Sequence, residues 1–505
     1  MLLSRIRTLL KQSSIYSVSW LATSLTGVLL LPVYTAYMTP ADYGIVQILE
    51  YTARVLLIAV VAGQVPAIYR FYNERESDAE RRQVVATGFT YVAGVSALAL
   101  LAIYPFNGPL SGLLLGEGAD PVFLRLAIAV LFCDILILVP TAYFTVAQRP
   151  LTYVAYSLGR LAVGVAANLV FIVGMKLGAL GMLLGNLTSS LTFAVVMSAH
   201  MIARNGLPGR RDLLMPMLRF GLPMVPALMA SALMQNADRY FLRAFAGLDQ
   251  VGIYSLGYKF PFFLASLVIS SFGMVWSSHM LYSIAKDPAA KWQFARIATY
   301  FFTGFTFLMY CLALSASTVI HVMADAAYWE AIQVIPVVCL GMCFYALHSF
   351  ATVGAYITKR TLRVPASYLV ALAVNLGLNY LVVPVYGYLG AAWVAAATYL
   401  VFCVVGYLVC NPIYPIAFEF RRLGHVLALA LGLYALFHLV PAMPGAWDLV
   451  RQSGFALLFP VALFATGFLN RNEVAVANAL MTRSPLPPGV DTPVDVGAAR
   501  TDEGA

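Results

Sequence analysis

The chain contains 505 residues, of which 61% are hydrophobic and only 10% are charged. A soluble globular protein has about 25% charged residues, so this composition excludes a soluble globular fold. The formal net charge of +9 does not indicate a nucleic-acid partner, because the basic residues lie in short loops between apolar stretches, which is a signal of membrane topology.

Apolar stretches recur along the chain, and at about 20 residues each is long enough to cross a hydrocarbon core as a helix. A β-barrel would show shorter segments of alternating polarity instead. The sequence therefore predicts an all-α integral membrane protein of about fourteen transmembrane helices. The expected spans cover residues 13–37, 43–69, 83–106, 121–147, 151–175, 178–201, 216–245, 249–280, 293–321, 327–357, 364–386, 388–410, 425–441 and 447–469.

The two ends of the chain differ from the spans. The start, MLLSRIRTLLKQ, is basic and precedes a long apolar run without a clear cleavage site. We therefore interpret it as the beginning of a retained first span rather than as a secretory signal. The tail at 470–505 is polar and rich in Pro and Gly, a composition that predicts disorder.

The sequence offers little support for catalytic or cofactor chemistry. Cys339 and Cys343 share a helix face, but no histidine or carboxylate accompanies them, which argues against a metal site. The six histidines are scattered without ligand spacing, and a P-loop is absent. The six cysteines fall in or beside apolar segments, so a disulfide framework is not expected. We expect no cofactor, no metal and no catalytic residue. The protein is therefore not expected to be an enzyme.

Basic residues concentrate in alternate connections between the spans. Positive residues mark the cytoplasmic side, so these connections and, with an even number of spans, both termini are expected in the cytoplasm. The opposite connections are mostly short, apart from the segment near 107–121, and they contain few basic residues. The basic connections hold Arg5, Arg7 and Lys11; Arg70, Arg75, Arg81 and Arg82; Arg149; Arg204, Arg210 and Arg211; Lys286 and Lys291; Lys359, Arg360 and Arg363; Arg421 and Arg422.

An internal repeat divides the chain. DYGIVQI at 42–48 corresponds to QVGIYSL at 250–256, which aligns Gly44 with Gly252 at an offset of 252 − 44 = 208 residues. GALG at 178–181 corresponds to GYLG at 387–390, an offset of 387 − 178 = 209. Because about six spans make up each half, the halves enter the membrane in the same direction, as parallel repeats that hold substrate between them. The expected domains are two six-helix halves at 1–201 and 202–424, two added helices at 425–469 and a cytoplasmic tail at 470–505.

Two segments resemble the hallmark regions of polysaccharide-biosynthesis flippases. They are LPVYTAYMTPADYGIVQIL near the start and MQNADRYFLRAFAGLDQVGIYSLGYKF at 234–260. That family belongs to the multidrug/oligosaccharidyl-lipid/polysaccharide exporter superfamily, which also contains the lipid II flippases and the multidrug and toxin extruders. The resemblance covers roughly residues 10–470, including the repeat.

The resemblance implies a cargo, a location and partners. Members of the family are carriers of the bacterial inner membrane that move undecaprenyl-pyrophosphate-linked oligosaccharides to the outer leaflet by alternating access. Their products include O-antigen, capsule and exopolysaccharide. Membrane lipids, a polysaccharide polymerase and a chain-length regulator are the implied partners, and the last two spans are implied to form a groove for the polyprenyl tail.

Ionisable residues inside the spans are the candidate site residues. Each costs about 2.5–3.5 kcal/mol to insert, and such residues usually face a protein interior or a watery cavity. Arg54 lies about 16 Å into its span and Lys259 about 12 Å into its own, at a rise of 1.5 Å per residue. The candidates are Glu50, Arg54, Asp134, Arg160, Asp238, Arg239 and Lys259.

The two repeats thus offer cations at similar depth, which suits an anionic cargo. Arg54 and Lys259 are expected to line a cleft between the halves and to hold the pyrophosphate implied by the resemblance. Gln47 and Glu50 share a helix side with Arg54 at i, i+3, i+7 spacing, and Glu50 is expected to orient Arg54. Arg160 completes the predicted substrate-binding set.

Each candidate also has a structural explanation. Glu50 and Arg54 could form a self-neutralising pair, Lys259 could extend to the membrane surface, and Arg160 could hold helices together. Asp134 is either a protonated buried acid or a coupling-ion site. The adjacent Asp238 and Arg239 are candidates for a contact between halves or for coupling or gating. Three prolines are expected to permit a bend in the seventh span: Pro216, Pro223 and Pro226.

Two other functions stay open at this point. A drug or cation extruder could have the same fold, although cationic cargo calls for an acidic cleft and the predicted one holds more cations than carboxylates. A membrane-embedded glycan polymerase or ligase would need a sizeable loop with catalytic residues, and the sequence shows no such loop.

Overall fold

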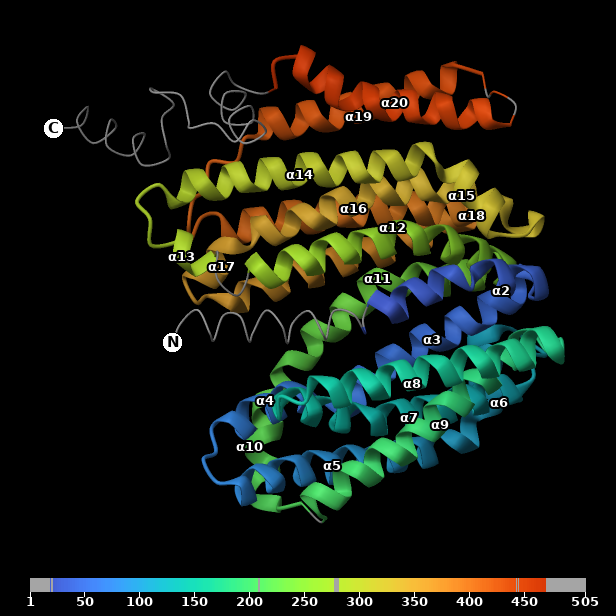
Figure 1. Cartoon of the computed structure of the whole chain (residues 1–505), viewed down its shortest axis with the longest axis vertical. Helices are drawn as coiled ribbons and strands as arrows, with labels where there is room; N and C mark the ends of the chain where they lie inside the picture. Colours follow the sequence, from blue (N-terminus) through green and yellow to red (C-terminus); the bar gives the residue numbers. More distant parts are fainter. Residues whose placement is uncertain are drawn as a thin grey trace. The chain divides into compact units, whose positions relative to one another are not determined.

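The computed structural model describes residues 19, 21–207, 209–276, 281–441, 443 and 445–468, and every regular element within these ranges is helical (Figure 1). The basic start of the chain, the first part of the first span, the end of the eighth span and the predicted disordered tail lie outside the described residues.

The helices follow the predicted spans closely. In the first repeat they are α2 (Leu31–Tyr37), α3 (Pro40–Val61), α4 (Gln64–Asn73), α5 (Asp78–Ile103), α6 (Asn107–Leu115), α7 (Pro121–Val146), α8 (Pro150–Asn168) and α9 (Gly178–Asn205). In the second they are α10 (Arg211–Gly221), α11 (Val225–Phe245), α12 (Leu248–Val275), α13 (Leu281–Ile284), α14 (Ala290–Leu314), α15 (Ala316–Met323), α16 (Val334–Ala351), α17 (Val353–Ile357) and α18 (Val364–Cys410). The last two are α19 (Phe420–Leu439) and α20 (Ala446–Ala465).

The number of spans agrees with the prediction of about fourteen. Twelve helical segments of the described chain are long and apolar enough to cross a membrane, and Leu21–Tyr37 forms a shorter apolar helix. One of the twelve, Thr361–Cys410, has 50 residues and contains Gly387 at φ 53° and ψ −135°, which lies outside the helical region. It therefore consists of two consecutive spans that meet at Gly387, at the predicted boundary.

Three elements differ in detail from the predicted spans. The second span is broken, because Ala62 (φ 49°) and Gly63 (φ 70°) are left-handed and separate α3 from α4. The seventh span is broken by a 3₁₀ turn at Leu222–Met224, whereas Pro216 lies inside α10. The segment expected as a long outward connection contains the helix α6, in which Asn107 and Pro109 fall in the first turn, where a proline is tolerated.

The described chain folds into two compact units. One comprises the described residues up to Leu256 together with Ile320–Ala331 and Asn375–Val394. The other comprises Gly257–Val319, Ile332–Val374 and the described residues from Ala395 onward. We call these unit 1 and unit 2. The predicted domain boundaries, which follow the sequence repeat rather than contacts, stay a prediction.

Each unit has its own apolar core. In unit 1, buried side chains of α4, α5, α7 and α9 pack together, among them Ile68, Val85 and Phe144. In unit 2, Trp276, which follows α12 directly, packs against Phe294 of α14 and Phe350 of α16. The apolar surface of a span that is not packed against other helices is then suited to face the lipid, where no water is present to bind exposed backbone groups.

The repeat recurs in the contacts of unit 1. Asp42, in the first turn of α3, accepts a hydrogen bond from the backbone N–H of Ala179 at 3.5 Å. Gln250, in the first turn of α12, accepts one from the backbone N–H of Tyr388 at 3.0 Å. The acceptors are separated by 250 − 42 = 208 residues and the donors by 388 − 179 = 209, so equivalent helices are joined in equivalent ways.

Candidate functional site

The polar side of α3 carries three of the predicted binding residues. Thr39 caps the helix by accepting a hydrogen bond from the N–H of Asp42 at 3.1 Å, and this cap fixes where the helix begins. Further along, the buried Gln47 donates through Nε2 to Oε2 of Glu50 at 3.3 Å. Glu50 and Arg54 are both exposed. Gln47, Glu50 and Arg54 are therefore on one side of α3. The amide at one end of this row is buried, and the guanidinium at the other end is exposed.

Arg54 lies near an aromatic ring as well as near this polar side. Its Cζ is 5.9 Å from the ring centroid of Tyr51, within the range of a cation–π contact. A contact of this kind at an exposed position is worth only about 0.5–1 kcal/mol. Charge-assisted hydrogen bonds to a phosphate are stronger, so an anion at this surface would draw the guanidinium away from the ring.

Asp134 and Arg160 come together in unit 1 with a third residue. Arg160 of α8 donates through Nη2 to Oδ1 of Asp134 on α7 at 2.5 Å and to Oγ of Ser190 on α9 at 2.9 Å. Ser190 also donates to Asp134 at 2.6 Å. The side chains of Arg160 and Asp134 are 35% and 32% exposed, so the pair is only partly buried. Two residues predicted for separate roles thus form one charge-compensated cluster.

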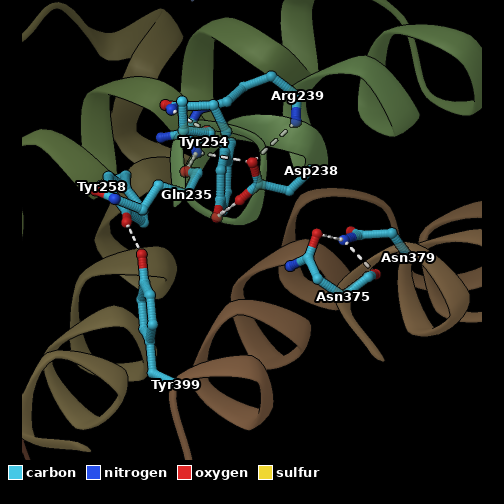
Figure 2. A network of polar contacts seen from close by, with 10 residues as sticks. Gln235, Asp238, Arg239, Tyr254, Tyr258, Asn375, Asn379 and Tyr399 are labelled. Carbon is cyan, nitrogen blue, oxygen red and sulfur yellow. Dashed lines mark hydrogen bonds and ion pairs between the residues drawn. The ribbon is translucent and has the colours of Figure 1, made fainter. Parts of the chain in front are cut away.

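Asp238 and Arg239 form a second ion pair, in α11, and this one is deeply buried (Figure 2). Nη1 of Arg239 lies 2.7 Å from Oδ1 of Asp238, with side-chain exposures of 0% and 3%. The same guanidinium nitrogen donates to the backbone carbonyl of Gln235 at 2.9 Å. Tyr254 of α12 donates its hydroxyl to the other carboxylate oxygen of Asp238. Adjacent residues point about 100° apart on a helix, but the long arginine side chain closes that gap.

Aromatic rings from two further helices cover Arg239. Its Cζ lies 4.8 Å from the ring centroid of Tyr51 on α3 and 4.8 Å from that of Tyr254 on α12. Beside it, the hydroxyls of Thr52 and Tyr240 lie 2.9 Å apart and join α3 to α11. Arg239 of α11 therefore contacts a helix of the first repeat, α3, as well as its neighbour α12 of the second. Its predicted role in coupling or gating stays a prediction.

Lys259, the other predicted pyrophosphate ligand, belongs to unit 2. It is half-buried, and its neighbour Tyr258 shares a short hydroxyl–hydroxyl hydrogen bond with Tyr399 (Figure 2). Arg54 belongs to unit 1, so the predicted meeting of Arg54 and Lys259 at one cleft stays a prediction.

Several residues of these clusters had no part in the sequence prediction. Tyr51, Tyr254 and Ser190 complete the two ion-pair clusters, but tyrosine and serine are common in apolar spans and neither the spacing nor the repeat singles them out. Gln250 could have been found, since it aligns with Asp42 in the repeat. Figure 2 adds Asn379, which donates to the side-chain oxygen of Asn375 at 3.0 Å in α18.

Comparisons with known proteins place the chain in a family. The sequence profile described as "Polysaccharide biosynthesis protein" matches residues 9–277, more than half of the 505-residue chain. No curated protein sequence matches the chain.

Solved structures show the fold. A structure of the lipid II flippase MurJ in an inward closed conformation matches with a TM-score of 0.72 at 13% identity, covering 89% of this chain and 99% of that one. A mutant of the Vibrio cholerae MATE transporter VcmN matches with a TM-score of 0.54 at 16% identity, covering 80% and 96%. An inward-facing multidrug resistance MATE transporter of the MOP superfamily gives 0.52 at 15%, covering 82% and 95%.

These similarities agree with the predicted flippase family and with the all-helical membrane fold derived from hydropathy. The chain belongs to the polysaccharide biosynthesis protein family, as a multi-pass membrane protein with the fold shared by lipid II flippase and MATE transporter structures.

Proposed function

We propose that the chain moves undecaprenyl-pyrophosphate-linked oligosaccharides from the inner to the outer leaflet of a bacterial inner membrane, for O-antigen, capsule or exopolysaccharide biosynthesis. Its family and its fold support a carrier of lipid-linked cargo. One observation carries the proposal furthest: the guanidinium of Arg54 is exposed on a membrane-spanning helix, where an uncompensated cation would be costly unless it faced water or an anion.

The proposed binding residues divide the work on the pyrophosphate. Arg54 supplies a planar pair of N–H donors that matches phosphate oxygens, and Lys259 supplies a second cation at similar predicted depth. Glu50 lies one turn from Arg54 and accepts from Gln47. A carboxylate one helical turn from the guanidinium is proposed to weaken its hold on an anion, so that cargo can leave as well as bind.

Arg160 is proposed to bind the cargo only after Asp134 has taken up a proton or a cation. In the described conformation the charge of Arg160 is balanced by Asp134 at 2.5 Å. Protonation of Asp134, or a cation bound to it, would free Arg160 to attract the cargo. Both side chains are about one-third exposed, which this exchange of partners requires. Asp238 and Arg239 are proposed to act in gating rather than in cargo binding.

The proposal includes a setting for the protein. Both termini lie in the cytoplasm, the polyprenyl tail stays in the membrane lipid, and a polymerase and a chain-length regulator use the delivered repeat units. A carrier, unlike a polymerase or ligase, leaves its cargo chemically unchanged.

Deletion of the gene tests this function. Lipid-linked repeat units should accumulate fully assembled at the inner leaflet while surface polymer disappears, and the intact gene supplied on a plasmid should restore the polymer. If repeat units were absent, or were exported but chemically unfinished, an enzymatic role would replace the carrier role.

Export of organic cations is the second candidate, since MATE transporter structures share the fold. The exposed carboxylate of Glu50 is the feature of the site that suits a cation. The deletion strain distinguishes the two functions: increased sensitivity to cationic dyes with normal surface polymer would favour the extruder and contradict the flippase.

A further inference from the structure

A cavity lies within unit 2, where α12 and α16 end. Its volume is about 610 Å³, within the range of about 300–1,000 Å³ that is common for small-molecule sites. All of its described lining residues belong to unit 2, and they come from the end of α12, from α13, α14, α16 and α17, and from the start of α18. We call it the aromatic cavity; its wall includes Phe272, Tyr282, Phe301, Ser349 and Tyr368.

The aromatic cavity lies at the end of unit 2 that is expected to face the cytoplasm. The connections from α12 to α14 and from α16 to α18 contain α13 and α17, which contact each other (Figure 1). The same connections hold Lys286, Lys359 and Arg360, and basic connections mark the cytoplasmic side. The glycan of a lipid-linked cargo lies on that side before transport.

The lining of the aromatic cavity suits a neutral ligand. No charged side chain is among the described residues that line it. A phosphate group would therefore meet no cation there and an organic cation would meet no carboxylate, although a charge removed from water needs such a partner. His348 belongs to the wall, but its ring is stacked on Phe402 at 3.5 Å between centroids and shares a hydrogen bond with Ser367 at 3.1 Å, so it is held by the protein itself.

Aromatic rings supply the apolar part of the wall. The ring centroid of Phe272 lies 4.4 Å from that of Phe301 and 5.6 Å from that of Phe350. Tyr282 and Tyr356, which also line the cavity, are exposed. The face of an aromatic ring carries partial negative charge, and a sugar ring presents a face of slightly positive C–H groups that packs well against it.

Hydroxyl groups stand beside these rings. Ser270 and Ser349 line the cavity and are exposed, although each lies in a membrane-spanning helix. Ser270 donates its proton to the carbonyl oxygen of Ser266 at 2.5 Å. Because a hydroxyl oxygen has two acceptor lone pairs, it can still accept a hydrogen bond from a ligand. Aromatic faces together with hydroxyl groups match a sugar better than they match a purely apolar acyl chain.

We propose that the aromatic cavity binds the glycan of the lipid-linked cargo. Sugar rings would stack on its aromatic side chains and donate hydrogen bonds to Ser270 and Ser349. The inference rests on the proposed function, to which it adds a site for the neutral part of the cargo. Arg54 and Lys259, proposed to hold the pyrophosphate, do not line this cavity.

The test compares how two lipids stabilise the purified full-length protein in detergent against thermal unfolding. One is undecaprenyl pyrophosphate that carries the glycan repeat unit of the source strain, and the other is undecaprenyl pyrophosphate alone. Because only the first reaches the aromatic cavity as well as the cationic residues, it should raise the unfolding midpoint at a severalfold lower concentration than the second.

Variants of the wall should remove this difference between the lipids. Tyr282→Ala deletes an exposed ring and Ser349→Phe fills the cavity, so both should respond to the glycan-bearing lipid only as strongly as to undecaprenyl pyrophosphate alone. Ser453→Phe is the matched control, because Ser453 is exposed in α20 and does not line the cavity; this variant should keep the full difference.

A conservative variant guards against a merely structural effect. Tyr282→Phe keeps the ring and should keep the difference between the lipids. Substitution of an exposed side chain usually changes stability little, so the unfolding midpoints of both Tyr282 variants without lipid should stay near that of the unchanged protein. A difference that persisted in both Tyr282→Ala and Ser349→Phe would overturn the glycan site.

The outcomes separate the aromatic cavity from the proposed function. Equal stabilisation of the unchanged protein by the two lipids would overturn the glycan site and leave transport of a polyprenyl pyrophosphate standing. Stabilisation by neither lipid would contradict both. Stabilisation by the cationic dye ethidium that is lost in Ser349→Phe and kept in Ser453→Phe would assign the cavity to organic cations instead of sugars.

Discussion

At the scale of single residues, the ion pairs Asp134–Arg160 and Asp238–Arg239 differ in what surrounds them. Asp238 and Arg239 are almost completely buried, whereas Asp134 and Arg160 are about one-third exposed. Removing one partner of a buried pair leaves an uncompensated charge, which costs about 3–5 kcal/mol, while an exposed pair contributes little. Burial thus makes the Asp238–Arg239 pair, which we propose acts in gating, important for stability as well, whereas the Asp134–Arg160 pair contributes less to stability.

Asp238→Asn should therefore lower the free energy of unfolding by about 3–5 kcal/mol, because the charge of Arg239 then has no carboxylate beside it. The measurement is the midpoint of thermal unfolding of the purified protein in detergent. The double variant Asp238→Leu, Arg239→Leu should lose less, and Asp134→Asn, the matched change in the accessible pair, should lose least. Equal losses for the two asparagine variants would contradict this assignment.

Arg54 and Lys259 should behave as cargo residues. Arg54→Ala and Lys259→Ala should each abolish or strongly reduce surface polymer at near-normal membrane abundance, because removing an intramembrane cation relieves insertion cost. Arg54→Lys should keep partial function, since the charge survives but the paired N–H donors do not. Export is measured as surface polymer per cell.

The control for these variants is Arg82→Ala, which removes an exposed cation near the start of α5 and should leave export unchanged. Full export by the Arg54→Ala, Lys259→Ala double variant would refute the cationic site and leave the self-neutralising pair as the explanation of Glu50 and Arg54.

The sequence could identify the charged members of these clusters but not their partners. Charges are rare in apolar spans, so Asp134 and Arg160 stand out, yet nothing in the local sequence indicates that they face each other from α7 and α8. The contacts of Tyr51 and Tyr254 with Arg239 arise from tertiary packing alone. The predicted cleft between Arg54 and Lys259 depends on the repeat register and stays a prediction.

At the scale of helices, the boundary inside α18 depends on one residue. Gly387 has φ 53° and ψ −135°, a conformation that strains any residue with a Cβ. A Cβ there would also overlap Oε1 of Gln250, which accepts the N–H of Tyr388 at 3.0 Å. The turn between the two spans is thus fixed both by backbone conformation and by a contact with α12.

Gly387→Ala should lower the free energy of unfolding by at least about 1–3 kcal/mol, the usual cost of a strained backbone residue. Gly377→Ala lies in the same helix with no atom within 4 Å of the added Cβ and should be neutral or slightly stabilising. Thermal unfolding midpoints of the two variants provide the comparison. A loss in Gly377→Ala as large as that in Gly387→Ala would show that strain is not the cause.

Hydropathy predicted which helices exist better than where they break. The transmembrane segments follow from runs of apolar residues, which the membrane requires whatever the tertiary packing. Hydropathy does not indicate the break after α3, because Ala62 is an ordinary helix former that adopts a left-handed conformation there. The bend in the seventh span was expected from its prolines, but Pro216 lies inside α10 and the turn falls at Leu222–Met224.

At the scale of the whole molecule, the basic connections fix the proposed orientation. Single cysteines at Arg210 and Lys286, both exposed, should react only with reagents that enter the cytoplasm. Cysteines at Thr39 and Asp325, also exposed, should react with an impermeant reagent in intact cells. Labelling at position 210 from outside would reverse the orientation.

Two reciprocal contacts between α3 and α12 bear on where this architecture comes from. A Cβ atom on Gly44 would overlap the carbonyl oxygen of Leu248, and one on Gly252 would overlap that of Pro40. In a two-fold symmetric dimer, residue i of one subunit meets residue j of the other and the converse holds equally. Gly44 with Leu248 and Gly252 with Pro40 obey that rule within one chain. A six-helix ancestor that paired with its own copy through a single glycine would make this same contact. Joining two copies of its gene would then have kept the interface intact and allowed each half to acquire its own charges.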